Sequence, residues 1–381
     1  MSLPTTISTF AEIPSSTKNM RLSIQVHGNE MIDIDSKRLS VFYGTLESPA
    51  VIYASVIFET DQGCSANDVE VTYNACASFN APVFSFYTAQ AKSDDTFQKK
   101  RWLMDLDRPA MGKVAPGSYV KEVSATIDPL WPSSARTAIH ANGHGWVKYV
   151  FEAKLIRQLL GMPNVLLVAS QEVWVLNSTL PAPSTGNLMG LGNPSPLIVR
   201  DSWKKSTLPV SITLPSDALT MAQVVPITVK MGSLTGKFAG QTIVVMSAHF
   251  ALRELVYGRA NGHDDVQYDF SYDVITVPLN DGWLRTAGPW ERTVNLTMPT
   301  TPQVAASAKT KWMDIMHSLV LVMKIKAESE KDRKAEQFEL KADVQIVVPR
   351  HTPESNEDFL PTYSLASPGQ ESLRREMLPA Y

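Results

Sequence analysis

The sequence predicts an all-β protein built from two successive antiparallel sandwiches, and three observations favour this class. The chain's 25 prolines and 19 glycines are spread along all 381 residues. They separate short segments rich in Val, Ile, Thr, Phe and Tyr, which are the residue types of strands. Stretches with the apolar period of a helix are scarce. Hydrophobic residues make up 44% of the chain, enough for two packed cores.

The first half contains seven strand-like segments. Within 147–156 the sequence Val-Lys-Tyr-Val-Phe-Glu-Ala-Lys-Leu-Ile partly alternates between apolar and polar residues. Such alternation is typical of a strand with one face in a core and one in water. The expected strands are 39–42, 50–59, 69–73, 83–87, 119–127, 146–156 and 165–176. Together they predict an amino-terminal sandwich over residues 1–180.

A change of composition marks the end of this first sandwich. From about residue 176 to 205 the periodicity stops and Pro, Ser, Gly and Asn predominate, as is typical of a domain boundary. We therefore expect a linker over residues 181–207 and a second sandwich over residues 208–349. The strands expected in the second sandwich are 208–214, 224–231, 242–251, 266–277, 294–298, 313–325 and 339–348. Residues 350–381 lack the strand pattern and predict a short mobile tail.

Charge and cysteine content exclude several classes of partner and site. The 35 Lys and Arg against 38 Asp and Glu give a net charge of -3, so there is no basic excess for nucleic acid and none is expected as a partner. The two cysteines, Cys64 and Cys76, lack the spacing of a zinc or redox site. No apolar run approaches the ~20 residues of a membrane span, and the first residues lack the features of a secretory signal. We expect a cytoplasmic protein.

The sharpest enzyme motifs are absent, including the nucleophile elbow, the Walker loop and the dinucleotide fingerprint. One acidic cluster remains, in which Asp264 and Asp265 follow a histidine and precede Asp269. Several carboxylates together can bind Mg²⁺ or Ca²⁺. In a strand, however, Asp264 and Asp265 would point to opposite faces. The favoured interpretation is a polar loop that enters a strand.

Two further features involve histidine. His140 and His144 flank Ala-Asn-Gly, so they predict a turn that displays two imidazoles, either solvated or as half of a metal or acid/base site. The solvated turn is the favoured interpretation. His317 lies alone in an apolar strand-like segment, where a histidine is more often a hydrogen-bonded structural residue than a ligand.

The order of several segments resembles the arrestin family, and in particular the alpha-arrestin branch found in fungi. In the first half these segments are Arg101-Trp-Leu-Met, Val114-Ala-Pro-Gly-Ser-Tyr, Asp128-Pro-Leu-Trp-Pro-Ser-Ser and Gly145-Trp-Val-Lys-Tyr-Val-Phe-Glu-Ala-Lys-Leu. In the second half they are Pro209-Val-Ser-Ile-Thr-Leu, Pro226-Ile-Thr-Val-Lys and Ile315-Met-His-Ser-Leu-Val-Leu-Val-Met-Lys. The resemblance covers most of the chain and rests on the order and spacing of these segments.

Two tetrapeptides of the tail extend the resemblance. They look like variants of the Pro-Pro-x-Tyr peptides with which alpha-arrestins recruit WW domains of HECT-type ubiquitin ligases, with leucine in place of the first proline. A WW groove binds an extended, proline-stiffened peptide and accommodates its tyrosine ring. The candidate partner-binding residues are Leu360, Pro361, Tyr363, Leu378, Pro379 and Tyr381.

The resemblance implies two tandem immunoglobulin-like sandwiches that act as an adaptor without a cofactor or catalytic residues. Such an adaptor binds membrane-protein cargo and recruits a ubiquitin ligase, which leads to ubiquitination and endocytosis of the cargo. It is cytoplasmic and can be recruited to the plasma membrane or endosomes. The alternative is an enzyme that has reused the arrestin fold in a biosynthetic pathway. The candidate residues of its site are Asp264, Asp265, Asp269, His140 and His144. They come from both domains, so the site would lie at the interface between the domains, and it could bind a metal ion.

Overall fold

The structure is a computed structural model, and the fold is all-β wherever it is described. The described residues are 15–17, 19–28, 30–82, 90–107, 113–139, 143–178, 195–204, 207–260, 263–279, 285–286, 288–311, 313–330 and 334–350. They contain strands and two short 3₁₀ turns, η1 (Gly236–Phe238) and η2 (Glu328–Glu330), and no α-helix. The described residues, all of which lie before His351, belong to one compact unit. The all-β prediction is confirmed.

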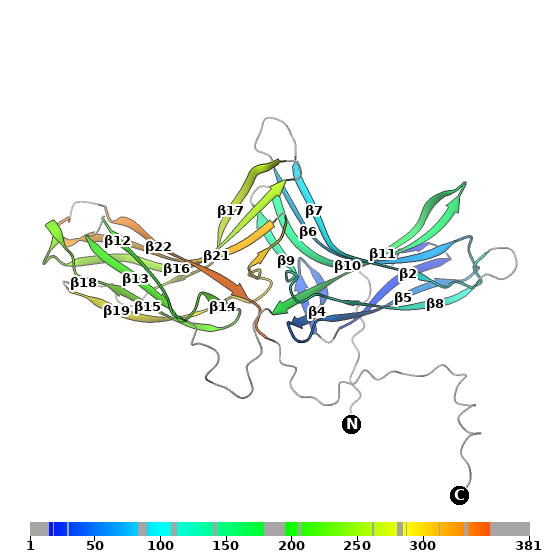
Figure 1. Ribbon diagram of the computed structural model, residues 1–381, viewed down its shortest axis with the longest axis horizontal. Helices are drawn as coiled ribbons and strands as arrows, with labels where there is room; N and C mark the ends of the chain where they lie inside the picture. The colour runs from blue at the N-terminus through cyan, green and yellow to red at the C-terminus, as the bar shows by residue number, and fades with distance from the viewer. Residues whose placement is uncertain are drawn as a thin grey trace, which may run out of the picture. The chain divides into compact units, whose positions relative to one another are not determined.

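The strands between residues 15 and 178 form two sheets (Figure 1). One is antiparallel and has the order β1 (Ser15–Thr17), β2 (Met20–His27), β5 (Val51–Thr60), β8 (Gly117–Thr126). The other has the order β3 (Glu30–Ile34), β4 (Lys37–Thr45), β11 (Met162–Ser178), β10 (Gly143–Leu159), β6 (Asp68–Pro82), β7 (Gln90–Met104), and β9 (Ala135–Ile139) pairs with one end of β10. Its pairs are antiparallel except β4 with β11.

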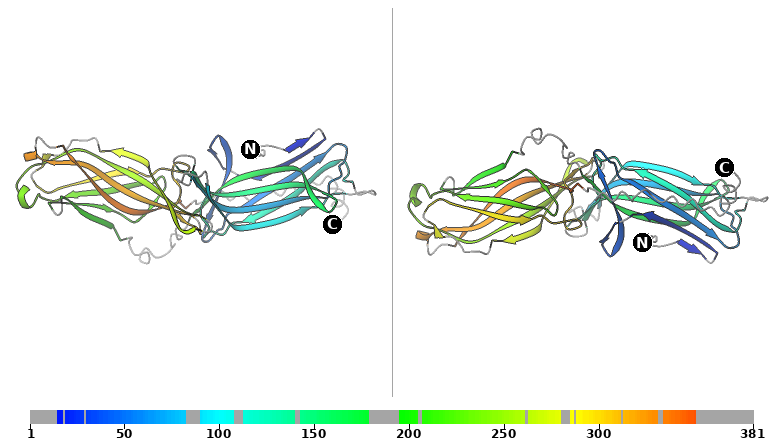
Figure 2. Two further views of the ribbon diagram at one scale, coloured as in Figure 1. Left: turned by 90° about the horizontal axis from the view of Figure 1, so that it is seen from above. Right: turned by 90° about the horizontal axis from the view of Figure 1, so that it is seen from below.

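The strands between residues 197 and 347 form two more sheets, and extended strands run along both halves of the unit (Figure 2). The smaller sheet is antiparallel, with the order β12 (Leu197–Trp203), β13 (Leu208–Leu214), β15 (Val224–Met231), β19 (Trp290–Thr297). The larger has the order β14 (Ala218–Thr220), β22 (Glu336–Val347), β21 (Met313–Ala327), β16 (Ile243–Ala260), β17 (His263–Pro278). β18 (Arg285–Thr286) pairs with β16, and β20 (Ala308–Lys309) with β21.

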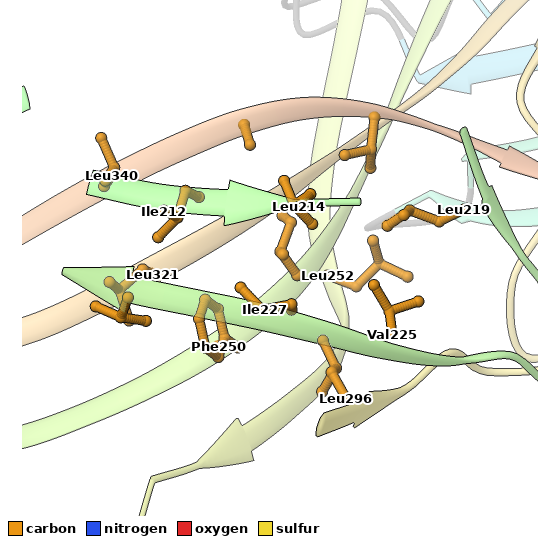
Figure 3. Packing of buried hydrophobic residues seen from close by; sticks show 14 of the residues in the cluster. Ile212, Leu214, Leu219, Val225, Ile227, Phe250, Leu252, Leu296, Leu321 and Leu340 are labelled. Carbon is orange, nitrogen blue, oxygen red and sulfur yellow. The ribbon is translucent and has the colours of Figure 1, made fainter. Parts of the chain in front are cut away.

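Alternation of apolar and polar residues explains how these sheets pack in a sandwich-like manner. In β13 the side chains of Leu208, Val210, Ile212 and Leu214 are buried, and the residues between them face outward. Figure 3 shows apolar side chains of both sheets gathered in the space between them. Burial of one such side chain contributes roughly 1.5–3 kcal/mol, so this core is the main source of stability for the second half.

The first half has its own core, which is rich in aromatic residues. Tyr73 of β6 and Phe151 of β10 are fully buried, with ring centroids 5.0 Å apart. The two cores are not strictly separate. Trp174 of β11 belongs to the cluster of the second half, and Met313 of β21 belongs to that of the first. Both halves therefore share packed residues within the compact unit.

Several predicted boundaries differ from the structure. The favoured loop around Asp264 and Asp265 is wrong, because β17 begins at His263 and pairs with β16 as far as Ala260. The register of β16 and β17 shifts between Arg259 and Ala260, so residues 264–266 have no partner on β16 and form an irregularity near the start of β17. The expected strand 83–87 lies outside the described residues. Within the described ranges no helix combines the length and apolarity needed to cross a membrane.

Candidate binding groove

An open groove of about 520 Å³ crosses the outer face of the sheet formed by β12, β13, β15 and β19. Its floor contains a row of four residues, one from each strand: Arg200, Ser211, Lys230 and Glu291. The register pairs Arg200 with Ser211, Ser211 with Lys230, and Lys230 with Glu291. Directly opposed residues of neighbouring strands lie side by side on one face. The row is therefore continuous across the sheet.

The strand period explains why this row faces solvent. Val210 and Ile212 of β13 are buried on either side of Ser211, and Val229 and Met231 of β15 are buried on either side of Lys230. Successive side chains of a strand point to opposite faces. The apolar residues that build the core thus also position the polar row on the outer face.

The rim of the groove is made of rigid residues. Gly232 donates its backbone N–H to the carbonyl oxygen of Pro209 at 2.9 Å. A Cβ atom at Gly232 would lie 2.5 Å from Cγ of Pro209, so only glycine fits this close approach. Pro289 and Trp290 line the opposite end, beside β19. The prolines lack a backbone donor and have a fixed φ, which keeps the rim well defined.

Some charged residues of the groove form ion pairs with each other, and others do not. Nζ of Lys230 lies 3.0 Å from a carboxylate oxygen of Glu291, in an exposed ion pair that contributes about 1 kcal/mol or less. Asp201 accepts a hydrogen bond of 2.7 Å from the backbone N–H of Ser202. Arg200 is exposed and forms no ion pair with any residue that the structure describes. Its guanidinium is available to a carboxylate of a ligand.

The edge strand β19 has backbone groups that could bind a further peptide strand. β19 is the last strand in the order of its sheet, and in the described part of the chain it pairs only with β15. A strand with one unpaired side presents backbone N–H and C=O groups that another chain can bind. The groove therefore leads from a free cation on β12 to an open edge on β19.

The residues that the sequence singled out are only partly described. The tail candidates Leu360, Pro361, Tyr363, Leu378, Pro379 and Tyr381 lie outside the described residues, as does His140. His144 lies on β10, where its backbone is paired with Asn80 and Ala138.

The three acidic candidates Asp264, Asp265 and Asp269 lie on β17, and the backbone of Asp269 is paired with Tyr257. β10 and β17 belong to different sheets, and among the described residues no strand pairing joins them. In the described part of the chain, no three His, Cys, Asp or Glu residues are grouped as a metal site.

The prediction that His317 is a hydrogen-bonded structural residue is confirmed. Its Nδ1 lies 2.9 Å from the hydroxyl of Ser307, and its Nε2 lies 3.2 Å from a carboxylate oxygen of Glu254. Glu254 also accepts hydrogen bonds from the Tyr272 hydroxyl and from the backbone N–H of Ala305. Both side chains of this hydrogen-bonded pair are almost fully buried, so the cluster braces β16 against β21 and is closed to a ligand.

Sequence reasoning missed the groove, although one signal was present. The alternation in Pro209-Val-Ser-Ile-Thr-Leu indicates which residues face outward, but not which strands lie beside them.

No protein-family model matches the chain, and no curated protein matches it.

Proposed function

We propose that this chain is an arrestin-like adaptor whose sheet surface binds an extended segment of a membrane-protein cargo. The proposal includes two tandem immunoglobulin-like sandwiches, the first over residues 1–180. The second was expected over 208–349 after a linker 181–207, but it begins earlier, because β12 (Leu197–Trp203) pairs with β13 and belongs to its sheet. The open groove across the sheet of β12, β13, β15 and β19 is the observation that carries the proposal. Its charges, hydroxyl and prolines supply contacts suited to holding a peptide.

The dimensions of the groove suggest the length of the bound segment. Neighbouring strands lie ~4.8 Å apart and an extended chain rises ~3.3 Å per residue. Crossing from β12 to β19 spans three strand spacings, or about 14 Å, which corresponds to about four residues of an extended peptide. Because Arg200 has no ion-pair partner in the described residues, an acidic side chain of that peptide would bind at the β12 end.

A binding measurement tests the groove. The probe is a fluorescent peptide of alternating Glu and Val, and the readout is fluorescence anisotropy. Arg200→Glu should weaken binding about tenfold, since a charge-assisted hydrogen bond is replaced by repulsion. Arg21→Glu is the matched control, because Arg21 is an exposed arginine on β2. Equal affinities of the two variants would contradict the assignment of the groove.

The second part of the proposal is recruitment of a WW-domain HECT ubiquitin ligase by the tail of residues 350–381. It is supported by the two Leu-Pro-x-Tyr sequences, whose proximity can offset weak single contacts through effective concentration. Changing Tyr363 and Tyr381 together to Ala should abolish capture by immobilised WW domains. Tyr53→Ala is the control, since Tyr53 is an exposed tyrosine of β5. Unchanged capture by the double variant would remove the tail from the mechanism.

A further inference from the structure

The hairpin of β10 and β11 extends beyond the strands that support it. Its two strands are paired up to Leu159 and Met162, on either side of the turn. The pairing of β10 with β6 ends at Ile156, opposite Asp68, and β11 pairs with β4 only from Trp174 onward. Past Ile156 the hairpin is therefore a two-stranded ribbon without a third strand among the described residues. Figure 1 shows this end projecting away from the neighbouring strands.

The end of this ribbon is apolar and exposed. Leu160 is 98% exposed and Met162 is 73% exposed, and about half of Leu159 and Val165 is accessible to solvent. A single exposed apolar residue is common on a protein surface, but a contiguous group at a projecting tip indicates an interaction site. We call residues 157–165 the hairpin tip.

The two-residue turn of the hairpin holds its backbone in an energetically unfavourable conformation. Leu160 has φ 53° and Gly161 has φ 81°, the left-handed pair of a two-residue type I′ turn. That turn favours Asn-Gly, and a bulky residue at positive φ is a genuine outlier. Leu160 obtains almost no packing in return, because nearly all of its surface is in water. A strained residue that is not stabilised by its own molecule points to a role outside it.

The chemistry of the tip favours a lipid surface as its partner. The sequence Arg-Gln-Leu-Leu-Gly-Met-Pro-Asn-Val of residues 157–165 contains no carboxylate, and its one charge is the exposed Arg157. The nearest carboxylate in the strand register, Asp68, lies opposite Ile156, at the base of the tip. A projecting apolar end with a cation beside it can enter the acyl boundary while the cation stays at the headgroup phosphates.

We propose that the hairpin tip inserts Leu159, Leu160 and Met162 into the interface of an anionic membrane, with Arg157 at the headgroup level. The shape of the tip distinguishes a membrane from a folded partner. A folded partner would have to provide a pocket that matches this projecting tip, whereas a fluid lipid layer adapts to it. The inference is independent of the peptide groove, which belongs to another sheet.

Vesicle flotation tests this proposal with the full chain. The probes are vesicles of phosphatidylcholine alone and of phosphatidylcholine with phosphatidylserine. The wild type should float with both and more strongly with the anionic vesicles. Leu160→Asn should weaken vesicle binding about tenfold or more, because it removes the burial of one leucine side chain. Arg157→Gln should remove the preference for phosphatidylserine.

The controls separate this proposal from misfolding and from the peptide groove. Asparagine is favoured in the turn, so the Leu160→Asn variant should keep its fold, as checked by circular dichroism. Leu130→Asn changes another leucine, 74% exposed, and should float like the wild type. Arg200→Glu should also float normally, while Leu160→Asn should keep peptide affinity. The proposal is overturned if the wild type does not float, or if Leu160→Asn and Leu130→Asn float equally.

Discussion

The strain at the tip of the β10–β11 hairpin allows a stabilising substitution to be predicted. Leu160 occupies the first loop position with φ 53°, and a left-handed conformation costs an ordinary residue roughly 1–2 kcal/mol. Asparagine tolerates it better, and its presence before Gly161 completes the preferred Asn-Gly pair. Since Leu160 is almost fully exposed, its removal sacrifices little packing. Leu160→Asn should therefore increase the free energy of unfolding by about 1 kcal/mol.

Urea denaturation followed by tryptophan fluorescence measures this gain. With a slope of about 3 kcal/mol per molar urea, the midpoint should rise by about 0.3 M. Leu160→Ala is the matched control, because alanine removes the apolar side chain but keeps the cost of the left-handed backbone. If Leu160→Asn were no more stable than Leu160→Ala, the reasoning would be refuted, because relief of backbone strain is the only reason given for a difference between these two variants.

Two other predictions concern buried groups. His317→Ala should lower the free energy of unfolding by about 3 kcal/mol, because the buried Glu254 carboxylate loses its imidazole partner; a loss below about 1 kcal/mol in urea denaturation would contradict this. Burial raises the pKa of Tyr73 and Tyr149 above the ordinary value, so the folded state favours their neutral form. Their contribution to stability is fully present below pH ~10 and is lost as the pH rises further. Tyr149→Phe should reduce that alkaline loss, measured by denaturation at several pH values, whereas an identical pH dependence of the variant would contradict it.

Much of the fold could be predicted from local patterns. The expected strands 208–214 and 224–231 coincide with β13 and β15, because alternation with period two records directly which side of a strand is buried. β7 was missed, since its sequence carries Asp94, Asp95 and a run of Lys and Arg. β7 is the last strand in the order of its sheet, and its pairing with β6 holds a segment whose composition does not resemble a strand.

The candidate sites depended on relations that no local pattern contains. The row of the groove joins Arg200 to Glu291 through the register of four strands, and the Glu254–His317 pair joins residues 63 positions apart. The exposure of Leu160 follows from where β6 ends its pairing with β10. Alternation within a strand is set by the geometry of its own backbone, and it is therefore visible in the sequence. Strand order and register are set by the packing of the whole core, so the neighbours of each outward residue become known only in the folded chain.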